Sequence, residues 1–88
     1  MRRELKPENE RVVAQTRVWG SAGEYVVITA ALAEIGVRGD NYETMVFTAI
    51  QWDHGPRIED HKERYPCEDA AREGHERIVG ELEAGRLP

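Results

Sequence analysis

The sequence has few residues that could cross-link the chain or hold a metal. Its single cysteine, Cys67, excludes a disulfide within the chain. Four potential metal ligands flank one turn: Asp53, His54, Asp60 and His61. Alternation along a strand would send Asp60 and His61 to opposite faces, and no H-E-x-x-H or paired C-x-x-C pattern is present. We therefore expect neither a metal nor another cofactor.

Long apolar runs and excess positive charge are also missing. No segment approaches the ~20 apolar residues of a membrane-spanning helix, so we expect no membrane association. The formal net charge is −5, and the only compact basic group is formed by Arg2, Arg3 and Lys6. Because nucleic-acid binding requires a basic patch, a nucleic-acid partner is not expected.

Nucleophiles in a catalytic context are lacking as well. Ser21 is the only serine, and no G-x-S-x-G pattern surrounds it. Cys67 is expected at a helix start, where the dipole lowers a thiol pKa, but the neighbouring Glu68 and Asp69 oppose thiolate formation. We therefore predict no catalytic residues and a protein that is not an enzyme.

The composition that remains is typical of one small folded domain. With 88 residues, 40% of them hydrophobic and 33% charged, the chain is long enough for a single core. Residues 1–10 are polar and predict an N-terminal arm, and residues 11–88 predict one α+β domain. Since so short a chain buries little apolar surface, association into a homo-oligomer or with a partner would supplement its stability.

Two β-rich segments joined by a short turn predict a hairpin. Val12–Trp19 is β-branched and alternates in polarity. A hairpin-length turn at Gly20–Gly23 follows, and a second strand is expected from Glu24 to about Leu32. Residues 30–35 could equally be helical by propensity, and the glycines and aspartate of Gly36–Asp40 predict another turn.

Tyr42–Gln51 is the clearest strand in the sequence, and both of its faces carry apolar side chains. A strand of this kind is expected at the centre of a sheet. One face would hold Tyr42, Thr44, Val46, Thr48 and Ile50, and the other Met45, Phe47 and Ala49. After a turn at Asp53–Pro56, the charged segment Ile58–Tyr65 is suited to a sheet edge, because charge discourages pairing with other chains.

The C-terminal segment predicts an amphipathic helix from about Cys67 to Gly85. Ala71, His75, Ile78, Val79 and Leu82 recur at helical spacing. The order is therefore β-β-β-β-α, an antiparallel four-stranded sheet with the C-terminal helix packed on one face.

Four residues of this helix, Gly74, His75, Ile78 and Leu82, are expected to contact the sheet. Glycine costs ~1 kcal/mol relative to alanine inside a helix, so Gly74 suggests close approach of another backbone. His75 is expected to pack at this crossing and to hydrogen-bond a strand carbonyl. The alternative is a catalytic or ligand-binding role, because histidine titrates near neutral pH.

Three segments together resemble a known group of sequences. They are Tyr42–Phe47 (Y-E-T-M-V-F), Glu63–Tyr65 (E-R-Y) and Glu68–His75 (E-D-A-A-R-E-G-H). Their order is similar to that in short uncharacterised phage and prophage proteins, which have an F/Y-E-T-M-V-F strand and a helix carrying G-H. Two departures are the missing Asp-His pair near residues 32–36 and Cys67 in place of the usual Ser or Thr. The resemblance implies a phage context.

Aromatic and basic residues outside the helix form a candidate interaction surface, made of Trp19, Tyr25, Trp52, His54 and Arg57. Tryptophan and tyrosine are enriched at protein interfaces. The alternatives are packing in the core, or stacking on a nucleotide base. A nucleotide would also require phosphate contacts, and the sequence matches no phosphate-binding loop.

These observations favour a non-enzymatic phage-type accessory protein that acts by protein–protein interaction and modulates a host or defence protein. One alternative is a structural component of the virion head or tail. Another is a protein that sequesters a small molecule or nucleotide. The expected location is accordingly the cytoplasm of a bacterial host or the virion itself.

Overall fold

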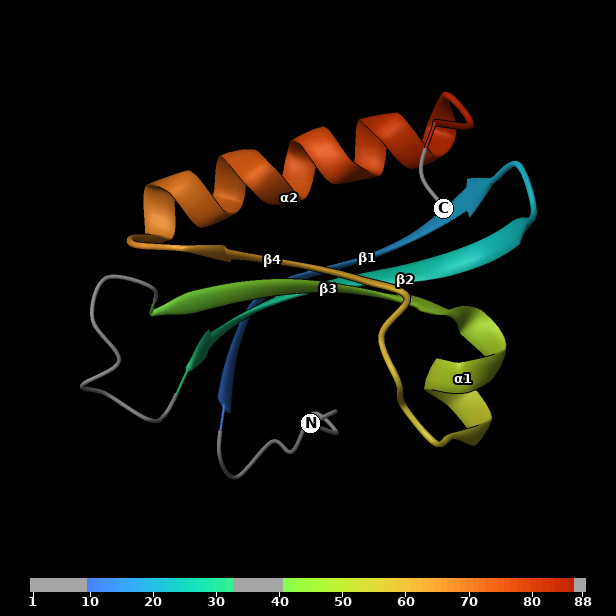
Figure 1. The fold of residues 1–88 in the computed structure, drawn as a ribbon, viewed down its shortest axis with the longest axis horizontal. Helices are drawn as coiled ribbons and strands as arrows, with labels where there is room; N and C mark the ends of the chain where they lie inside the picture. The colour runs from blue at the N-terminus through green and yellow to red at the C-terminus, as the bar shows by residue number, and fades with distance from the viewer. Residues whose placement is uncertain (1–9, 33–40, 87–88) are drawn as a thin grey trace.

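The computed structural model describes residues 10–32 and 41–86. Its elements are β1 (Glu10–Gly20), β2 (Gly23–Leu32), β3 (Tyr42–Thr48), α1 (Ala49–His54), β4 (His61–Tyr65) and α2 (Glu68–Glu83). The four strands form one antiparallel sheet in the order β1-β2-β3-β4. The long helix α2 lies across one face of the sheet, and the short helix α1 lies on the other side (Figure 1). The predicted α+β fold is confirmed.

The first two strands form the predicted hairpin. Gly20 pairs with Gly23 across a two-residue turn, and Gly23 has a φ of +137°, which favours glycine. The register shifts between Val12 and Ala14, so β1 contains an irregularity that the sequence pattern did not reveal. Beyond this irregularity the pairing continues to Glu10 and Leu32.

The central strands β2 and β3 are buried on both faces. Val27 and Val46 pack against Ile78 and Leu82 of α2. On the opposite face, a second cluster consists of Val26, Ile28, Ala30, Met45 and Phe47, and Ala49 and Trp52 pack against it. The apolar character of both faces thus correctly indicated that β3 is a central strand.

The prediction that this strand continues to Gln51 is wrong, because β3 ends at Thr48 and α1 follows. The backbone N–H of Gln51 donates to the Thr48 hydroxyl at 3.1 Å, and the Thr48 N–H donates to the Gln51 side chain at 3.3 Å. This reciprocal capping box starts a helix. Ile50 is therefore on a helix and 74% exposed, rather than in a strand.

The edge strand β4 is shorter than predicted. It spans His61–Tyr65, whereas the charged pattern predicted Ile58–Tyr65. The N–H of Asp60 donates to the Val46 carbonyl at 2.8 Å and leads the chain into the sheet. The side chain of Arg64 bonds the buried carboxylate of Glu43 on β3 at 3.0 Å, which joins the edge to its neighbour.

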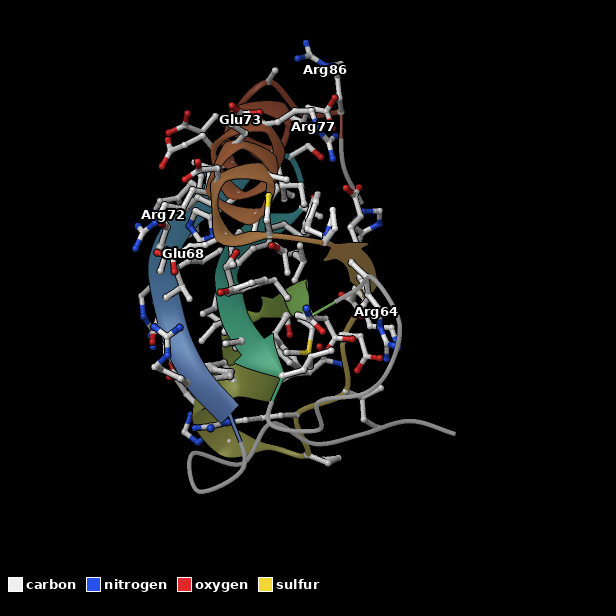
Figure 2. All side chains as sticks on the ribbon, turned by 90° about the vertical axis from the view of Figure 1, so that its left-hand side faces the viewer. Arg64, Glu68, Arg72, Glu73, Arg77 and Arg86 are labelled. Carbon is white, nitrogen blue, oxygen red and sulfur yellow. The ribbon has the colours of Figure 1, made fainter. Side chains whose placement is uncertain are left out.

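Helix α2 begins after Cys67, whose side chain makes no capping hydrogen bond, and Glu68 and Asp69 lie in its first turn. The helix ends at Glu83, and Gly85 follows with a φ of +76°. Viewed along the sheet, Glu68 and Arg72 lie on the flank of α2 above β1, and Arg64 lies at the far edge (Figure 2). One flank of the helix therefore overhangs the β1 edge.

Two sequence predictions, the turn at Gly36–Asp40 and most of the polar arm at 1–10, lie outside the described residues; residue 10 begins β1. Within the described parts of the chain, neither helix has the length and apolar character needed to cross a membrane.

Candidate interaction surface

The contact between α2 and the sheet is built around Gly74. A Cβ placed on Gly74 would lie 2.1 Å from the hydroxyl oxygen of Tyr65 on β4. Glycine at this position therefore makes room for the tyrosine ring, and not for a neighbouring backbone as predicted. Ala71, Ile78 and Leu82 are buried on the same helix face.

His75 is held between hydroxyl groups of two strands. Its Nδ1 lies 2.8 Å from the Thr29 hydroxyl, and its Nε2 lies 2.9 Å from the Thr16 hydroxyl. Thr29 also contacts the Thr44 hydroxyl at 2.6 Å. The predicted strand carbonyl is thus replaced by threonine side chains. Burial lowers the pKa of His75; the Glu76 carboxylate opposes this shift, and the Arg72 charge reinforces it.

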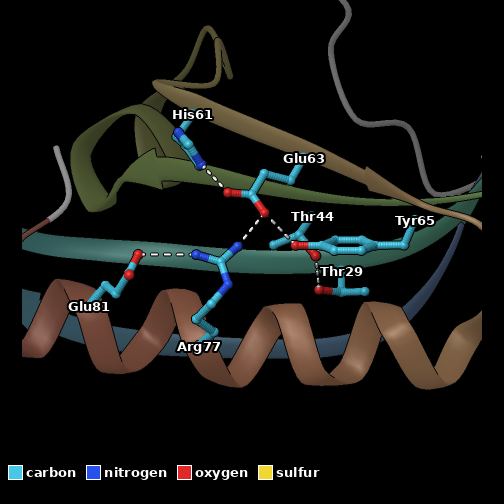
Figure 3. Close-up of polar contacts among 7 residues, drawn as sticks. All are labelled: Thr29, Thr44, His61, Glu63, Tyr65, Arg77 and Glu81. Carbon is cyan, nitrogen blue, oxygen red and sulfur yellow. Dashed lines mark hydrogen bonds and ion pairs between the residues drawn. The ribbon is translucent and has the colours of Figure 1, made fainter.

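A polar network joins β4 to the other flank of α2 (Figure 3). Glu63 receives a hydrogen bond from the Tyr65 hydroxyl at 2.7 Å, contacts His61 Nε2 at 2.8 Å and pairs with Arg77. Arg77 also donates to Glu81 at 3.1 Å. These contacts hold the edge strand β4 against α2.

The environment of this network changes the acidity of its members. Burial, together with the hydrogen bond to Glu63, raises the pKa of Tyr65 to about 12. Burial alone would raise the pKa of Glu63, but the hydrogen bonds from Tyr65 and His61 and the charge of Arg77 lower it below its usual value. The arrangement therefore favours a neutral tyrosine beside an ionised carboxylate, as expected for a structural clamp.

An apolar pocket opens at the turn end of the hairpin, and we call it the hairpin pocket. Its volume is about 500 Å³, and it is lined by Trp19, Ala22, Gly23, Glu24, Tyr25, Thr48, Ala49 and Ile50. Trp19 is 70% exposed and Ile50 is 74% exposed. Large, exposed apolar side chains in the lining of one hollow can contact an apolar group brought by another molecule.

The hairpin and α1 position the walls of this pocket. Tyr25 is buried, with its ring against Gly20, where a Cβ would lie 2.9 Å from the ring. Trp19 is the penultimate residue of β1, and the capping box at Thr48 starts the helix that carries Ile50 into the same lining. The buried wall of the pocket is therefore Tyr25, and the exposed walls are Trp19 and Ile50.

A second aromatic group lies beneath α1. Trp52 packs on Phe47 with ring centroids 5.2 Å apart, and the Arg57 guanidinium lies 3.8 Å from the Trp52 ring centroid. The Nε of Arg57 also donates to the Trp52 carbonyl at 2.8 Å. These contacts give Trp52 and Arg57 a role in fixing α1, while His54 is exposed at the end of that helix.

A charged pair ties α1 to β1. Arg17 contacts both carboxylate oxygens of Asp53, at 2.6 and 3.3 Å, and lies 3.8 Å from Glu24. The hydrogen bond to Arg17 lowers the pKa of Asp53. Among residues 10–32 and 41–86, no three His, Cys, Asp or Glu side chains are grouped closely enough to hold a metal ion.

The structure thus does not bring the five predicted interaction residues together at one site. Trp19 and Tyr25 line the hairpin pocket, whereas Trp52 and Arg57 pack together. Ile50 is the residue that sequence reasoning missed. The T-x-x-Q pattern of Thr48 and Gln51 was the available signal, because it is typical of a helix N-terminus.

Comparisons with protein-family models, with curated proteins and with solved structures gave no match to this chain. The fold itself defines the class: an α+β domain in which an antiparallel four-stranded sheet carries a C-terminal helix. Among the residues that the structure describes, the most exposed large apolar side chains, Trp19 and Ile50, line the hairpin pocket.

Proposed function

We propose that the protein is a non-enzymatic interaction module whose hairpin pocket accepts an apolar side chain of a partner protein. The observation that carries this proposal is the placement of Trp19 and Ile50, both at least 70% exposed, around one pocket of about 500 Å³. Burying a large apolar side chain contributes ~1.5–3 kcal/mol. Exposed walls of this kind therefore favour a bound state over the free one.

The chemistry of the lining supports a protein partner more than a nucleotide. Among the described residues that line the pocket, Glu24 alone is charged, and a carboxylate repels phosphate. Tryptophan and tyrosine are the residue types most enriched among side chains that dominate binding energy at protein interfaces. The proposed partner thus inserts an apolar residue and no phosphate.

The resemblance of residues 42–47, 63–65 and 68–75 to phage and prophage proteins supports, within this proposal, a role as a phage accessory factor. Its partner would be a host or defence protein in the bacterial cytoplasm. A virion component remains the competing assignment. Mass spectrometry of purified particles distinguishes the two, because a virion component is present there at many copies and an accessory factor is not.

The pocket is tested by replacing Ile50 with glutamate, which sets a charge at its rim without disturbing a buried contact. Tagged wild-type protein, Ile50→Glu and the control Glu73→Gln, on the exposed face of α2, are used to capture proteins from host lysate. We expect one protein to be captured by the wild type and the control and lost with Ile50→Glu. Equal capture by all three, with unchanged circular dichroism, contradicts the proposal.

A further inference from the structure

We propose that the open edge of β1 pairs in antiparallel fashion with β1 of a second copy of this chain, so that two sheets become one. The inference rests on the proposed function as an interaction module, and it assigns a homodimer to a surface other than the hairpin pocket. The proposal follows from the backbone, from the side chains of the strand and from the charges on α2.

The backbone of β1 pairs with another strand on one side only, among residues 10–32 and 41–86. β1 is 11 residues long, and its partner is β2. Because Gly20 and Gly23 close a two-residue hairpin, they exchange hydrogen bonds, and alternate residues before Gly20 direct their backbone groups away from β2. The N–H and C=O groups of Gln15, Arg17 and Trp19 therefore point to the open edge.

The opposite edge is protected by the short length and dense charge of β4. β4 has five residues, and its three central side chains, Lys62, Glu63 and Arg64, are all charged. Short length and charge are the features that discourage strands from pairing with other chains. Of the two edges, β1 is the one whose length and backbone suit strand addition.

The side chains of β1 complement their own copy. A two-fold axis beside Thr16 places Thr16 opposite Thr16 of the second copy and Gln15 opposite Arg17, so no two like charges face each other. Thr–Thr pairs across strands contribute ~0.2–1 kcal/mol. The irregularity at Val12–Ala14 marks the limit of regular pairing.

The flank of α2 above this edge carries both signs of charge. His75 binds Thr16, so the proposed axis passes near the middle of α2. Glu68 and Arg72 lie on the flank above β1 (Figure 2), and Glu76, one turn after Arg72, continues the same side by helical spacing. In the dimer the two helices run antiparallel, and Arg72 of each copy approaches Glu76 of the other.

The spacing of the elements is compatible with this arrangement. Strands within a sheet lie ~4.8 Å apart. Since α2 contacts all four strands, and β1 and β2 most, a helix axis above β2 would separate the two copies of α2 by about three strand spacings, or ~14 Å. The helices of the joined sheet therefore do not overlap, and long side chains such as arginine and glutamate make the contact between them.

The first test changes the edge backbone. Gln15→Pro removes an N–H that points to the open edge of β1 and so does not pair with β2. Proline is tolerated where a strand N–H faces solvent. Gln15→Thr is the matched control. By light scattering after gel filtration, we expect twice the 10.0 kDa protomer mass for wild type and Gln15→Thr, and the protomer mass for Gln15→Pro. A monomeric wild type up to its solubility limit overturns the proposal.

The second test does not depend on how proline affects the strand. Arg72→Glu places like charges across the dimer axis and is expected to weaken association at least tenfold, while the double variant Arg72→Glu/Glu76→Arg restores it. Unchanged association in the single variant, or no recovery in the double variant, contradicts the helix contact and with it the proposed geometry.

The two proposals fail separately. Ile50→Glu is expected to leave the dimer intact while abolishing partner capture, and Gln15→Pro is expected to do the reverse. A protein that is monomeric yet still captures its partner loses only the dimer. If the protein is a dimer and Ile50→Glu captures the partner as well as the wild type does, only the function proposed for the hairpin pocket is contradicted.

Discussion

At the residue scale, His75 shows how a polar side chain becomes part of a core. It is 1% exposed, and each ring nitrogen faces a threonine hydroxyl, on Thr29 and on Thr16. A neutral imidazole has one donor and one acceptor, and hydroxyl groups can serve either need. The neutral ring is therefore satisfied, whereas a charged ring would be buried without a counter-ion in direct contact.

This arrangement predicts that stability decreases in mild acid. Because burial lowers the pKa of His75 below its ordinary 6.5, the unfolded chain binds a proton that the folded chain does not. The free energy of unfolding should fall as pH drops below 6.5, by at most ~1.4 kcal/mol per pH unit for this one proton. Urea unfolding above and below pH 6.5 measures the slope, and His75→Gln should remove that part of it. An unchanged slope in this variant contradicts the assignment.

Two glycines of α2 provide a matched comparison. A Cβ at Gly74 meets the Tyr65 ring, whereas a Cβ at Gly80 meets nothing within 4 Å. Gly74→Ala should destabilise by up to ~2 kcal/mol, because overpacking costs ~1–3 kcal/mol against a gain of ~1 kcal/mol in helix propensity. Gly80→Ala should stabilise by up to ~1 kcal/mol. Urea denaturation of both variants is the measurement; equal effects would mean that Tyr65 moves aside freely.

At the scale of elements, the short helix α1 decides the shape of the candidate site. It begins where the sequence pattern suggested that β3 continues, and it carries Ile50 to the rim of the hairpin pocket. Trp52 anchors it on Phe47, and Asp53 anchors it on Arg17 of β1. The pocket thus depends on an element of six residues that is held mainly by side chains.

Removing the capping box should loosen this element. Thr48→Ala deletes the acceptor of the Gln51 N–H and should cost about 1 kcal/mol, as caps of this type do. Thr48→Ser keeps the hydroxyl and should retain most of that free energy. Chemical denaturation gives both values, and hydrogen exchange of residues 49–54 should accelerate only in the alanine variant. Equal exchange in the two variants would show that the cap does not hold α1.

The elements differ in how well the local sequence pattern predicted them. The hairpin, the central strand and the amphipathic helix followed from local periodicity and turn residues. The helix α1 did not, because Ala49, Ile50 and Trp52 prolong a strand-like apolar pattern in which only the Thr48–Gln51 spacing signals a cap. The clamp of Tyr65 and Glu63 on α2 depends on how β4 and the helix are aligned in space, and no local pattern carries that information.

At the scale of the whole molecule, the sheet separates two apolar clusters. One lies between the sheet and α2, and the other lies on the face covered in part by α1. In a chain of 88 residues each cluster is small, so the free energy available from burial is limited. Association along β1 would add backbone hydrogen bonds and ion pairs to those of the single protomer.

This view predicts a melting temperature that depends on protein concentration. If folding is linked to dimerisation, mass action raises the melting temperature as the protein is concentrated. The wild type should therefore melt at higher temperature in more concentrated samples, whereas Gln15→Pro should melt at one temperature throughout. Differential scanning calorimetry over a dilution series makes the comparison. A wild type insensitive to dilution argues against association in the folded state.

The chain's two tryptophans occupy unlike surroundings, and this makes the protein its own optical probe. Trp19 is 70% exposed beside the hairpin pocket, so its emission should be red-shifted and open to quenching by iodide. Trp52, packed on Phe47 beneath the Arg57 guanidinium, should emit at shorter wavelength and be shielded. Binding in the pocket and unfolding can thus be followed in one unlabelled sample, as changes in two separable emission bands.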